Sequence, residues 1–200
     1  MGKNFCVDSS SPTAYLQIKN YLLSELKPVL DDNRPIIFVC IGTDRSTGDS
    51  LGPLVGYKLK LLNNSNIHIY GTLKSPIHAK NICKFISEIH SNFNNPYIIA
   101  IDSCLGSLNN IGKVFIKDSP LLPGLALNKD LPQIGDMSIT GIVNISGQFE
   151  FLVLQNTRLY TVMILADVIS KAIYHFYITC TKNSTPNSIL VKNNYQKLYI

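Results

Sequence analysis

The sequence is short of the features that mark several large classes of protein. Its 18 lysines and arginines are scattered along the chain, with no basic run and no basic patch interleaved with aromatics, so the net charge of +5 predicts no nucleic-acid partner. No segment contains about 18 uninterrupted apolar residues, and the first ten residues have no apolar core of signal-peptide length. We therefore expect no association with a membrane.

Cysteine and histidine are also sparse and poorly spaced for metal binding. The five cysteines are odd in number and form no C-x-x-C motif, and most lie in apolar segments, as reduced thiols of a protein core do. A cytoplasmic location is expected from this pattern. None of the four histidines forms a ligand-spaced pair, so no metal and no other cofactor is predicted.

What the chain does have is enough apolar sequence for one domain. It has 200 residues, 46% of them hydrophobic, and no repeat or linker divides it, so residues 1–200 are expected to form a single α/β domain with its core at about 35–177. A mostly parallel sheet with helices on both faces is predicted, because helices and strands alternate. In chain order, we expect a helix from Ser11-Pro12 to Lys27-Pro28, a strand at 35–41, a helix at 51–62, a strand at 67–71, a helix from Ser75-Pro76 to His90, and a strand at 97–101.

The second half of the chain is less regular. Residues 112–117 are expected to continue the sheet, and residues 119–147, dense in Pro and Gly, are expected to form a long loop with a short strand at 138–144. Apolar residues then recur at helical spacing over 151–177, which predicts one long closing helix.

Acidic residues follow two of the predicted strands. Asp44 and Asp49 lie in the glycine-rich turn after 35–41, and Asp102 ends the strand at 97–101. Ligands of an open α/β sheet bind at the carboxyl ends of its strands, so these acids are expected to share one site. An acid at the end of an apolar strand is costly to bury unless it is paired, hydrogen-bonded or used.

Two facing carboxylates could share a proton and activate water, or they could hold a divalent metal. For Asp49 alone, capping of a helix is an equally good explanation. The glycine-rich turn could also cradle a phosphate, but it lacks the ending of a P-loop and the register of a dinucleotide site, and its acids repel phosphate. Cys104 could be a nucleophile, although no histidine is adjacent and a small buried hydrophobe is the favoured interpretation.

A third polar cluster lies at 135–141. Its Asp136, Ser138 and Thr140 are expected either to line the site as substrate-binding groups or to serve as turn residues. Asp44 is included among the substrate-binding candidates because it shares the turn of Asp49.

Four segments together closely resemble the sporulation protein YyaC family, over roughly residues 35–175: residues 41–56, 100–106, 123–144 and 154–159. That family is similar, more distantly, to the germination protease of bacterial spores and to the hydrogenase maturation proteases. The resemblance implies a three-layer α/β/α, phosphorylase/hydrolase-like fold. It also implies that Asp49 and Asp102 match the proposed catalytic pair of the germination protease.

The same resemblance sets the functional expectation. Hydrogenase maturation proteases add a histidine to the two acids and bind nickel, whereas this sequence has no histidine at 135–141. The resemblance therefore implies a sporulation-associated peptidase that acts on a protein or peptide, such as a spore protein, in the cytoplasm of the sporulating cell or spore. The alternative is a non-catalytic peptide-binding or regulatory protein on the same fold.

Overall fold

The computed structural model describes residues 4–62, 66–122 and 133–183, which form a six-stranded mixed sheet in the order β1-β5-β6-β4-β2-β3. β4 pairs in parallel with β2 and β6, and β2 pairs in parallel with β3. β5 runs antiparallel to both of its neighbours, so it alone reverses the common direction. The strands are β1 (Asn4–Asp8), β2 (Ile36–Cys40), β3 (Ile67–Tyr70), β4 (Tyr97–Gly106), β5 (Lys113–Lys117) and β6 (Met137–Ile145).

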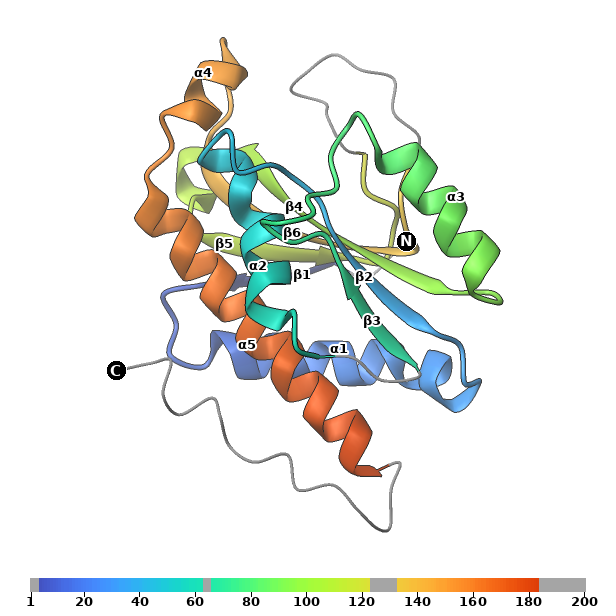
Figure 1. The fold of residues 1–200 in the computed structure, drawn as a ribbon. Helices are drawn as coiled ribbons and strands as arrows, with labels where there is room; N and C mark the ends of the chain where they lie inside the picture. The colour runs from blue at the N-terminus through green and yellow to red at the C-terminus, as the bar shows by residue number, and fades with distance from the viewer. Residues whose placement is uncertain (1–3, 63–65, 123–132, 184–200) are drawn as a thin grey trace.

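Helices cover both faces of this sheet, as Figure 1 shows. One apolar cluster joins the sheet to α1, α2 and α5, and a second joins its other face to α3. The predicted mostly parallel, three-layer α/β/α fold is therefore confirmed. The helices are α1 (Ala14–Asp31), α2 (Leu51–Leu59), α3 (Ile82–Asn92), α4 (Glu150–Gln155) and α5 (Leu159–Asn183), with short 3-10 turns η1 (Gly48–Ser50) and η2 (Leu108–Asn110).

β2 lies between β3 and β4, and all five of its residues are buried. Side chains alternate along a strand, so Phe38 and Cys40 enter the core beneath α5 while Ile37 and Val39 enter the core beneath α3. Phe38 meets the Phe176 ring of α5 edge-on, with centroids 6.3 Å apart. The continuous apolar run in the sequence is thus explained by burial on both faces.

α5 is the main helix of the first core. Its segment Leu159–Thr181 is long and apolar enough to cross a membrane by length and composition alone. In the folded chain this helix packs against α1 and α2, and the residues of its inner face are fully buried, so it is a core helix of the domain. The inner face consists of Val162, Leu165, Ala166, Ile169, Ala172, Ile173 and Phe176.

The helix boundaries differ from prediction in two places near proline. α1 begins at Ala14 and continues through Pro28 to Asp31. The proline is tolerated because it lies in the last turn of the helix. It has no N–H to donate to the Ser24 carbonyl, but Ser24 is an exposed residue, so water can replace that hydrogen bond. α3 begins at Ile82 and not at Ser75-Pro76. Residues 76–81 are held instead in an irregular segment, in which Ile77 forms a parallel bridge with Ile41.

The predicted closing helix at 151–177 is also wrong in extent, because it is two helices, α4 and α5, separated at residues 156–158. Thr157 interrupts the helical pattern there: its hydroxyl donates to the Val153 carbonyl at 2.8 Å and accepts from the Asn144 side chain at 3.2 Å.

Three strands were mispredicted. β1 was not expected at all; it is a short edge strand whose partner, β5, is distant in sequence. β6 is a nine-residue strand in the middle of the sheet, where a short strand within a long loop was predicted. β4 does not end at Asp102 but runs on to Gly106, through Ser103, Cys104 and Leu105, a segment too short and mixed to predict a strand. Residues 123–132 of the predicted loop lie outside the described residues.

Candidate active site

Asp49 is fixed by a tight turn between β2 and α2. Gly42 has a φ of 140°, and a Cβ at this position would overlap the carbonyl oxygen of Asp49. That same carbonyl accepts a hydrogen bond from the Thr43 N–H at 3.0 Å, while the Asp49 N–H donates to the Ser46 carbonyl at 3.1 Å. The turn therefore closes on the main chain of Asp49 and places it directly before α2, and a glycine is required where the two backbones meet.

Asp102 lies where the sheet opens. The β2–β4 ladder ends at the pair Cys40–Ile101, so from Asp102 onward β4 is paired only with β6. The Asp102 carboxylate accepts a hydrogen bond from the Ser103 N–H at 2.8 Å, and on β6 its register partner is Thr140. Asp102 thus stands at the open edge of the sheet, next to η1, which contacts β4.

The surroundings of both acids favour their neutral forms. Burial, together with the charge of Asp49, raises the pKa of Asp102 to about 8, against the opposing effect of the Ser103 N–H. Burial also raises the pKa of Asp49, which the Ser46 hydroxyl lowers in part. η1, which carries Asp49, contacts β4, which carries Asp102, so the two acids lie at the same end of the sheet. Burial favours the neutral form of Asp102.

Ser46 is the third polar side chain of this turn. It is 6% exposed, and within the described part of the chain its hydroxyl oxygen makes no hydrogen bond of good geometry, although it is close enough to affect Asp49. A buried hydroxyl that meets a carboxylate only in poor geometry is unusual, and a water or a substrate oxygen between the two groups would satisfy both. No signal in the sequence separates Ser46 from the other polar residues of the turn.

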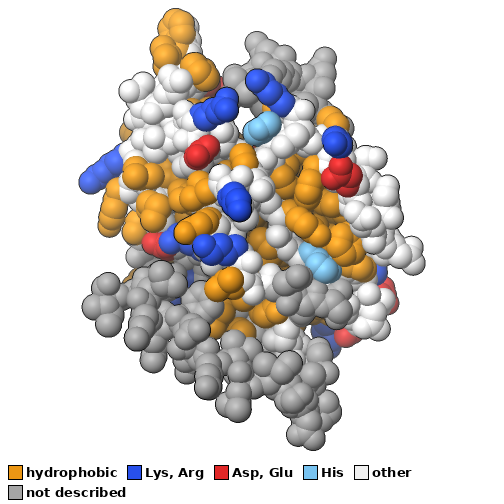
Figure 2. All heavy atoms as spheres, in the orientation of Figure 1, with side chains coloured by type: hydrophobic (Ala, Val, Ile, Leu, Met, Phe, Trp, Pro, Cys, Tyr) orange, Lys and Arg blue, Asp and Glu red, His pale blue; other side chains and the backbone are white. Residues whose placement is uncertain are grey.

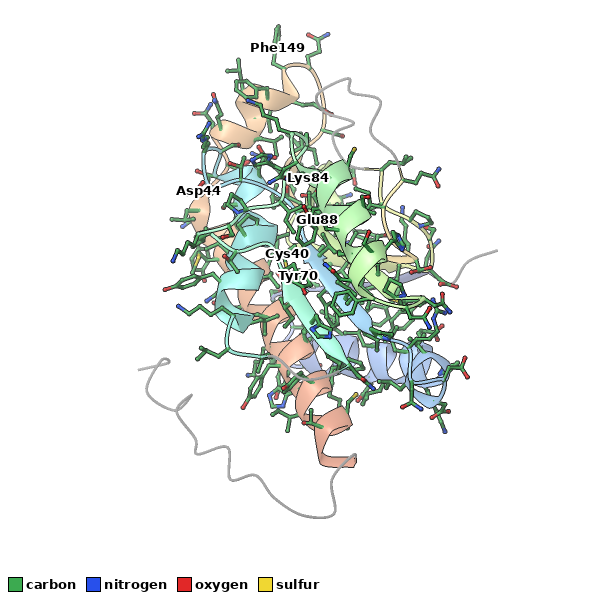
Figure 3. The ribbon with its side chains drawn as sticks, turned by 45° about the vertical axis from the view of Figure 1, so that its right-hand side comes forward. Cys40, Asp44, Tyr70, Lys84, Glu88 and Phe149 are labelled. Atoms are coloured by element: carbon green, nitrogen blue, oxygen red, sulfur yellow. The ribbon has the colours of Figure 1, made fainter. Side chains whose placement is uncertain are left out.

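The other predicted site residues fall in different places. Thr140 shares the face of Asp102 in the β4–β6 register, and Ser138 lies two residues deeper, 3% exposed, beside Ala100. Asp44 is exposed on the turn before η1, where Figure 3 labels it. The structure therefore brings Asp49, Asp102 and Thr140 together and leaves Ser138 buried below them.

Asp136 lies at the opposite edge of the sheet. Its carboxylate accepts a hydrogen bond from the Ile98 N–H at 2.8 Å, and its own N–H donates to the Ile98 carbonyl at 2.7 Å. Four residues of strand separate Asp136 from Thr140, which is about 13 Å at the usual rise. Asp136 is therefore a bridge between the beginnings of β4 and β6, remote from Asp102.

Cys104 does not match the favoured interpretation of a small buried hydrophobe, because its side chain is exposed. Two residues beyond Asp102, it lies on the same face of β4, and its thiol donates to the Leu105 carbonyl at 3.1 Å. Partial burial and the Asp102 charge raise the pKa of the Cys104 thiol. The raised pKa disfavours the thiolate form that a nucleophile needs. Cys6 and Cys83 are exposed as well, so the prediction of core thiols is right for Cys40 and wrong for these three.

The donors at the acid pair do not fit a nickel site. Among the described residues no group of three or more His, Cys, Asp or Glu side chains could hold a metal ion. His78 follows Ile77, whose carbonyl accepts from the Gly42 N–H, but its Nδ1 already accepts from the Lys80 N–H at 3.3 Å. Two carboxylates without a nitrogen donor make an incomplete set for such an ion.

A cleft of about 740 Å³ lies at the other edge of the sheet, lined by residues 91–96, Arg34 and Asp136 among others. Its charged groups are already engaged. Arg34 donates to the Asn95 carbonyl at 3.0 Å and lies over the Tyr97 ring, and Asp136 bonds to the main chain of Ile98. The acid pair, where two pKa values are raised together, is therefore the better candidate for chemistry.

Comparison with known proteins agrees with this fold. Over 167 residues the chain is 49% identical to the "Uncharacterized protein YyaC" of Bacillus subtilis strain 168, covering 84% of this chain and 80% of that protein. The fold is similar to that of HycI, a NiFe hydrogenase maturation protease from Thermococcus kodakarensis KOD1, with a TM-score of 0.52 and 17% identity over 75% of this chain and 99% of that one. Residues 6–172 match the family described as "Protein of unknown function (DUF1256)". The resemblance to YyaC is thus confirmed, and the chain belongs to the DUF1256 family.

Proposed function

We propose that the protein is a peptidase in which Asp49 and Asp102 activate a water molecule. The observation that carries this proposal is the position of Asp102, which lies beyond the last β2–β4 pair on a strand that contacts η1, the turn of Asp49. Burial and the Asp49 charge raise the pKa of Asp102 to about 8, in agreement with that position. One acid that stays protonated beside one that ionises is the arrangement of general acid–base catalysis by a carboxyl pair.

The reaction follows from the two protonation states. The Asp49 carboxylate takes a proton from water as the water oxygen bonds to the peptide carbonyl carbon, while the Asp102 carboxyl donates its proton to the carbonyl oxygen. Collapse of the tetrahedral intermediate breaks the C–N bond, the leaving nitrogen takes the proton that Asp49 had accepted, and the proton of the second hydroxyl returns to Asp102. The sum is one water added across one peptide bond, with the pair restored.

Ser46 and Thr140 support this assignment as positioning residues. The unpartnered Ser46 hydroxyl can orient the attacking water toward Asp49, and Thr140 is the register partner of Asp102 on β6. Asp44, exposed on the same turn, is available to a longer substrate. These roles require no metal or other cofactor.

The likeness of the fold to that of a hydrogenase maturation protease supports a protein or peptide substrate. We place the action in the cytoplasm of the sporulating cell or spore, with spore proteins as the first substrates to test.

A second candidate is a non-catalytic peptide-binding or regulatory protein. The observation in its favour is the position of the 740 Å³ cleft, which lies at the edge of the sheet away from the acid pair. Neither Asp49 nor Asp102 lines this cleft, so a partner bound there would not reach the acid pair.

The test compares cleavage of spore-protein peptides by the wild-type chain, by Asp49→Asn and by Asp102→Asn, with new termini detected by mass spectrometry. Each substitution keeps the size of the side chain and removes its acid. Glu88→Gln is the matched control, because Glu88 lies on the outer face of α3 in an exposed ion pair with Lys84 (Figure 3). Turnover that is equal in all four proteins would eliminate the acid-pair mechanism, and capture of peptides without new termini would favour the second candidate.

A further inference from the structure

Large exposed hydrophobic side chains gather around α4. Six of the eleven that the described residues expose lie between positions 145 and 160, and Figure 2 shows hydrophobic side chains at the tip of the molecule formed by α4. Single exposed apolar residues need no explanation, but a group of this size marks an interaction site. This α4 patch consists of Ile145, Phe149, Phe151, Leu152, Leu159 and Tyr160.

The patch is built to stay exposed. Of the six residues in α4 only Leu154 is buried. Phe149, which precedes the helix, has a φ of 56° and is 75% exposed, and its ring projects from the tip of the molecule (Figure 3). The left-handed region is unfavourable for an aromatic residue. The Phe149 carbonyl accepts hydrogen bonds from the Leu152 and Val153 N–H groups, which start α4, while the ring itself stays in solvent.

The patch adjoins the acid pair on two sides. A Cβ at Gly48 would come within 2.7 Å of the Leu154 side chain, so α4 rests directly on η1, the turn that carries Asp49. On the other side, the charge of Glu150 acts on Cys104, which lies two residues beyond Asp102. A chain bound across Asp49 and Asp102 would therefore continue onto α4.

The charge of the patch identifies its occupant. Residues 145–160 contain one acid, Glu150, and one base, Arg158, so the segment is neutral. A helix that binds a membrane surface carries a strongly basic face, which α4 lacks. A stable dimer interface uses about 20–30 residues on each partner, and the patch has six. Bulky apolar side chains of a bound polypeptide fit a patch that is neutral, small and next to the acid pair.

We infer that the α4 patch binds Leu- or Phe-type side chains of the polypeptide substrate, adjacent to the bond that the acid pair cleaves. The inference rests on the proposed function and adds to it the class of substrate. It predicts that sequence preference lies in the flanking apolar residues of the substrate.

The experiment uses two fluorescein-labelled pools of short peptides that differ only in whether chosen positions carry Leu and Phe or Ser. Binding is measured by fluorescence polarisation with the full chain carrying Asp49→Asn, which keeps peptides intact, and cleavage is measured with the wild-type chain. Leu152→Ser and Phe149→Ser test the patch. Leu61→Ser is the matched control, since Leu61 is 74% exposed but lies outside the patch, after α2.

We expect the apolar pool to bind about tenfold more tightly than the serine pool, and each patch variant to lose about tenfold of that affinity while Leu61→Ser loses none. Equal binding of the two pools, or an unchanged Leu152→Ser, would overturn the inference. If the pools bind equally, two further findings would name another occupant. Self-association in sedimentation that Leu152→Ser abolishes would point to a second copy of the chain, and binding to phosphatidylglycerol vesicles that Leu152→Ser abolishes would point to a membrane.

The two proposals fail separately. Cleavage that is lost in Asp102→Asn but unchanged in Leu152→Ser removes this inference and keeps the peptidase. Patch-dependent binding without new termini keeps the docking surface and removes hydrolysis.

Discussion

The carboxyl ends and the amino ends of the parallel strands form two edges of the sheet, here called the carboxyl edge and the amino edge. These two edges use the same kinds of residue in opposite ways. At the carboxyl edge, Asp102 lies beyond the last pair of the β2–β4 ladder, beside Asp49 and a buried hydroxyl without a partner. At the amino edge, Asp136 and Arg34 both bond to main-chain groups. An acid that satisfies the backbone is part of the scaffold, whereas two acids whose pKa values are raised by burial at one end of the sheet are candidates for chemistry. What separates the two edges is the set of partners of each acid.

The largest effect should be on catalysis at the carboxyl edge. Replacing Asp102 with Asn is expected to lower the rate of peptide cleavage by a factor of about 10² to 10⁴, because the amide cannot donate and recover a proton. Glu88→Gln should leave the rate unchanged. Rates measured under single-turnover conditions, with circular dichroism to check folding, decide the matter. A variant Asp102→Asn that cleaves at the wild-type rate would show that this edge is not catalytic.

The next effect concerns the turn that fixes Asp49. Gly42→Ala is expected to lower the free energy of unfolding by about 2–3 kcal/mol, because the new Cβ overlaps the Asp49 carbonyl at a φ of 140°. Gly147→Ala is the control, since a Cβ there meets no atom within 4 Å, and it should change stability by less than about 0.5 kcal/mol. Urea unfolding of the two variants gives both values. Similar losses of stability in Gly42→Ala and Gly147→Ala would mean that a Cβ at position 42 does not strain the turn.

The pH dependence of stability separates the edges further. The pKa of Asp102 rises from 3.8 to about 8 on folding, so the folded state favours its neutral form. That contribution is complete below pH 4 and is lost as the pH rises through 8. Asp102→Asn removes it, and at pH 9 the variant is expected to be more stable than the wild type by about 1–2 kcal/mol. Thermal unfolding at pH 5 and pH 9 measures the difference. An equal pH profile in variant and wild type would contradict the assignment.

The smallest effect is at the amino edge. Asp136→Ala removes the acceptor of the Ile98 N–H and is expected to cost about 1 kcal/mol of stability. The exposed Asp44 is the comparison, and Asp44→Ala should stay within about 0.5 kcal/mol of the wild type. Chemical denaturation compares them directly. If Asp44→Ala were the more destabilising, the roles given to the two residues would have to be exchanged.

Part of the fold was accessible from the sequence because it depends on local patterns. The continuous apolar run of 35–41, the glycine turn and the apolar strand leading to Asp102 predicted the parallel strands and brought two acids to one edge. The strands that were missed depend on distant partners. β1 is short and pairs with β5 across more than a hundred residues, and the last residues of β4 are held by β6 without an apolar signal of their own.

The site was predictable to the same extent. The direction of the strands was enough to predict where Asp49 and Asp102 lie. Which polar residues of β6 join them depends on the register of β6, and composition does not predict register. Thr140 therefore lies at the acid pair while Asp136, four residues earlier, lies at the far edge. The exposure of Cys104 depends on the overhang of β4, and the role of Ser46 depends on burial, so neither could be predicted.

The closing helix has a consequence for handling the protein. The Leu159–Thr181 segment of α5 is apolar enough to pass for a membrane span, and only its docking between the sheet and its neighbouring helices hides it from water. When the domain unfolds, the apolar side chains of this segment are exposed and can associate with other unfolded chains or with lipid. The solubility of the whole chain is therefore tied to the integrity of one packed helix. Refolding from denaturant should be cleanest at low protein concentration and in the absence of detergent.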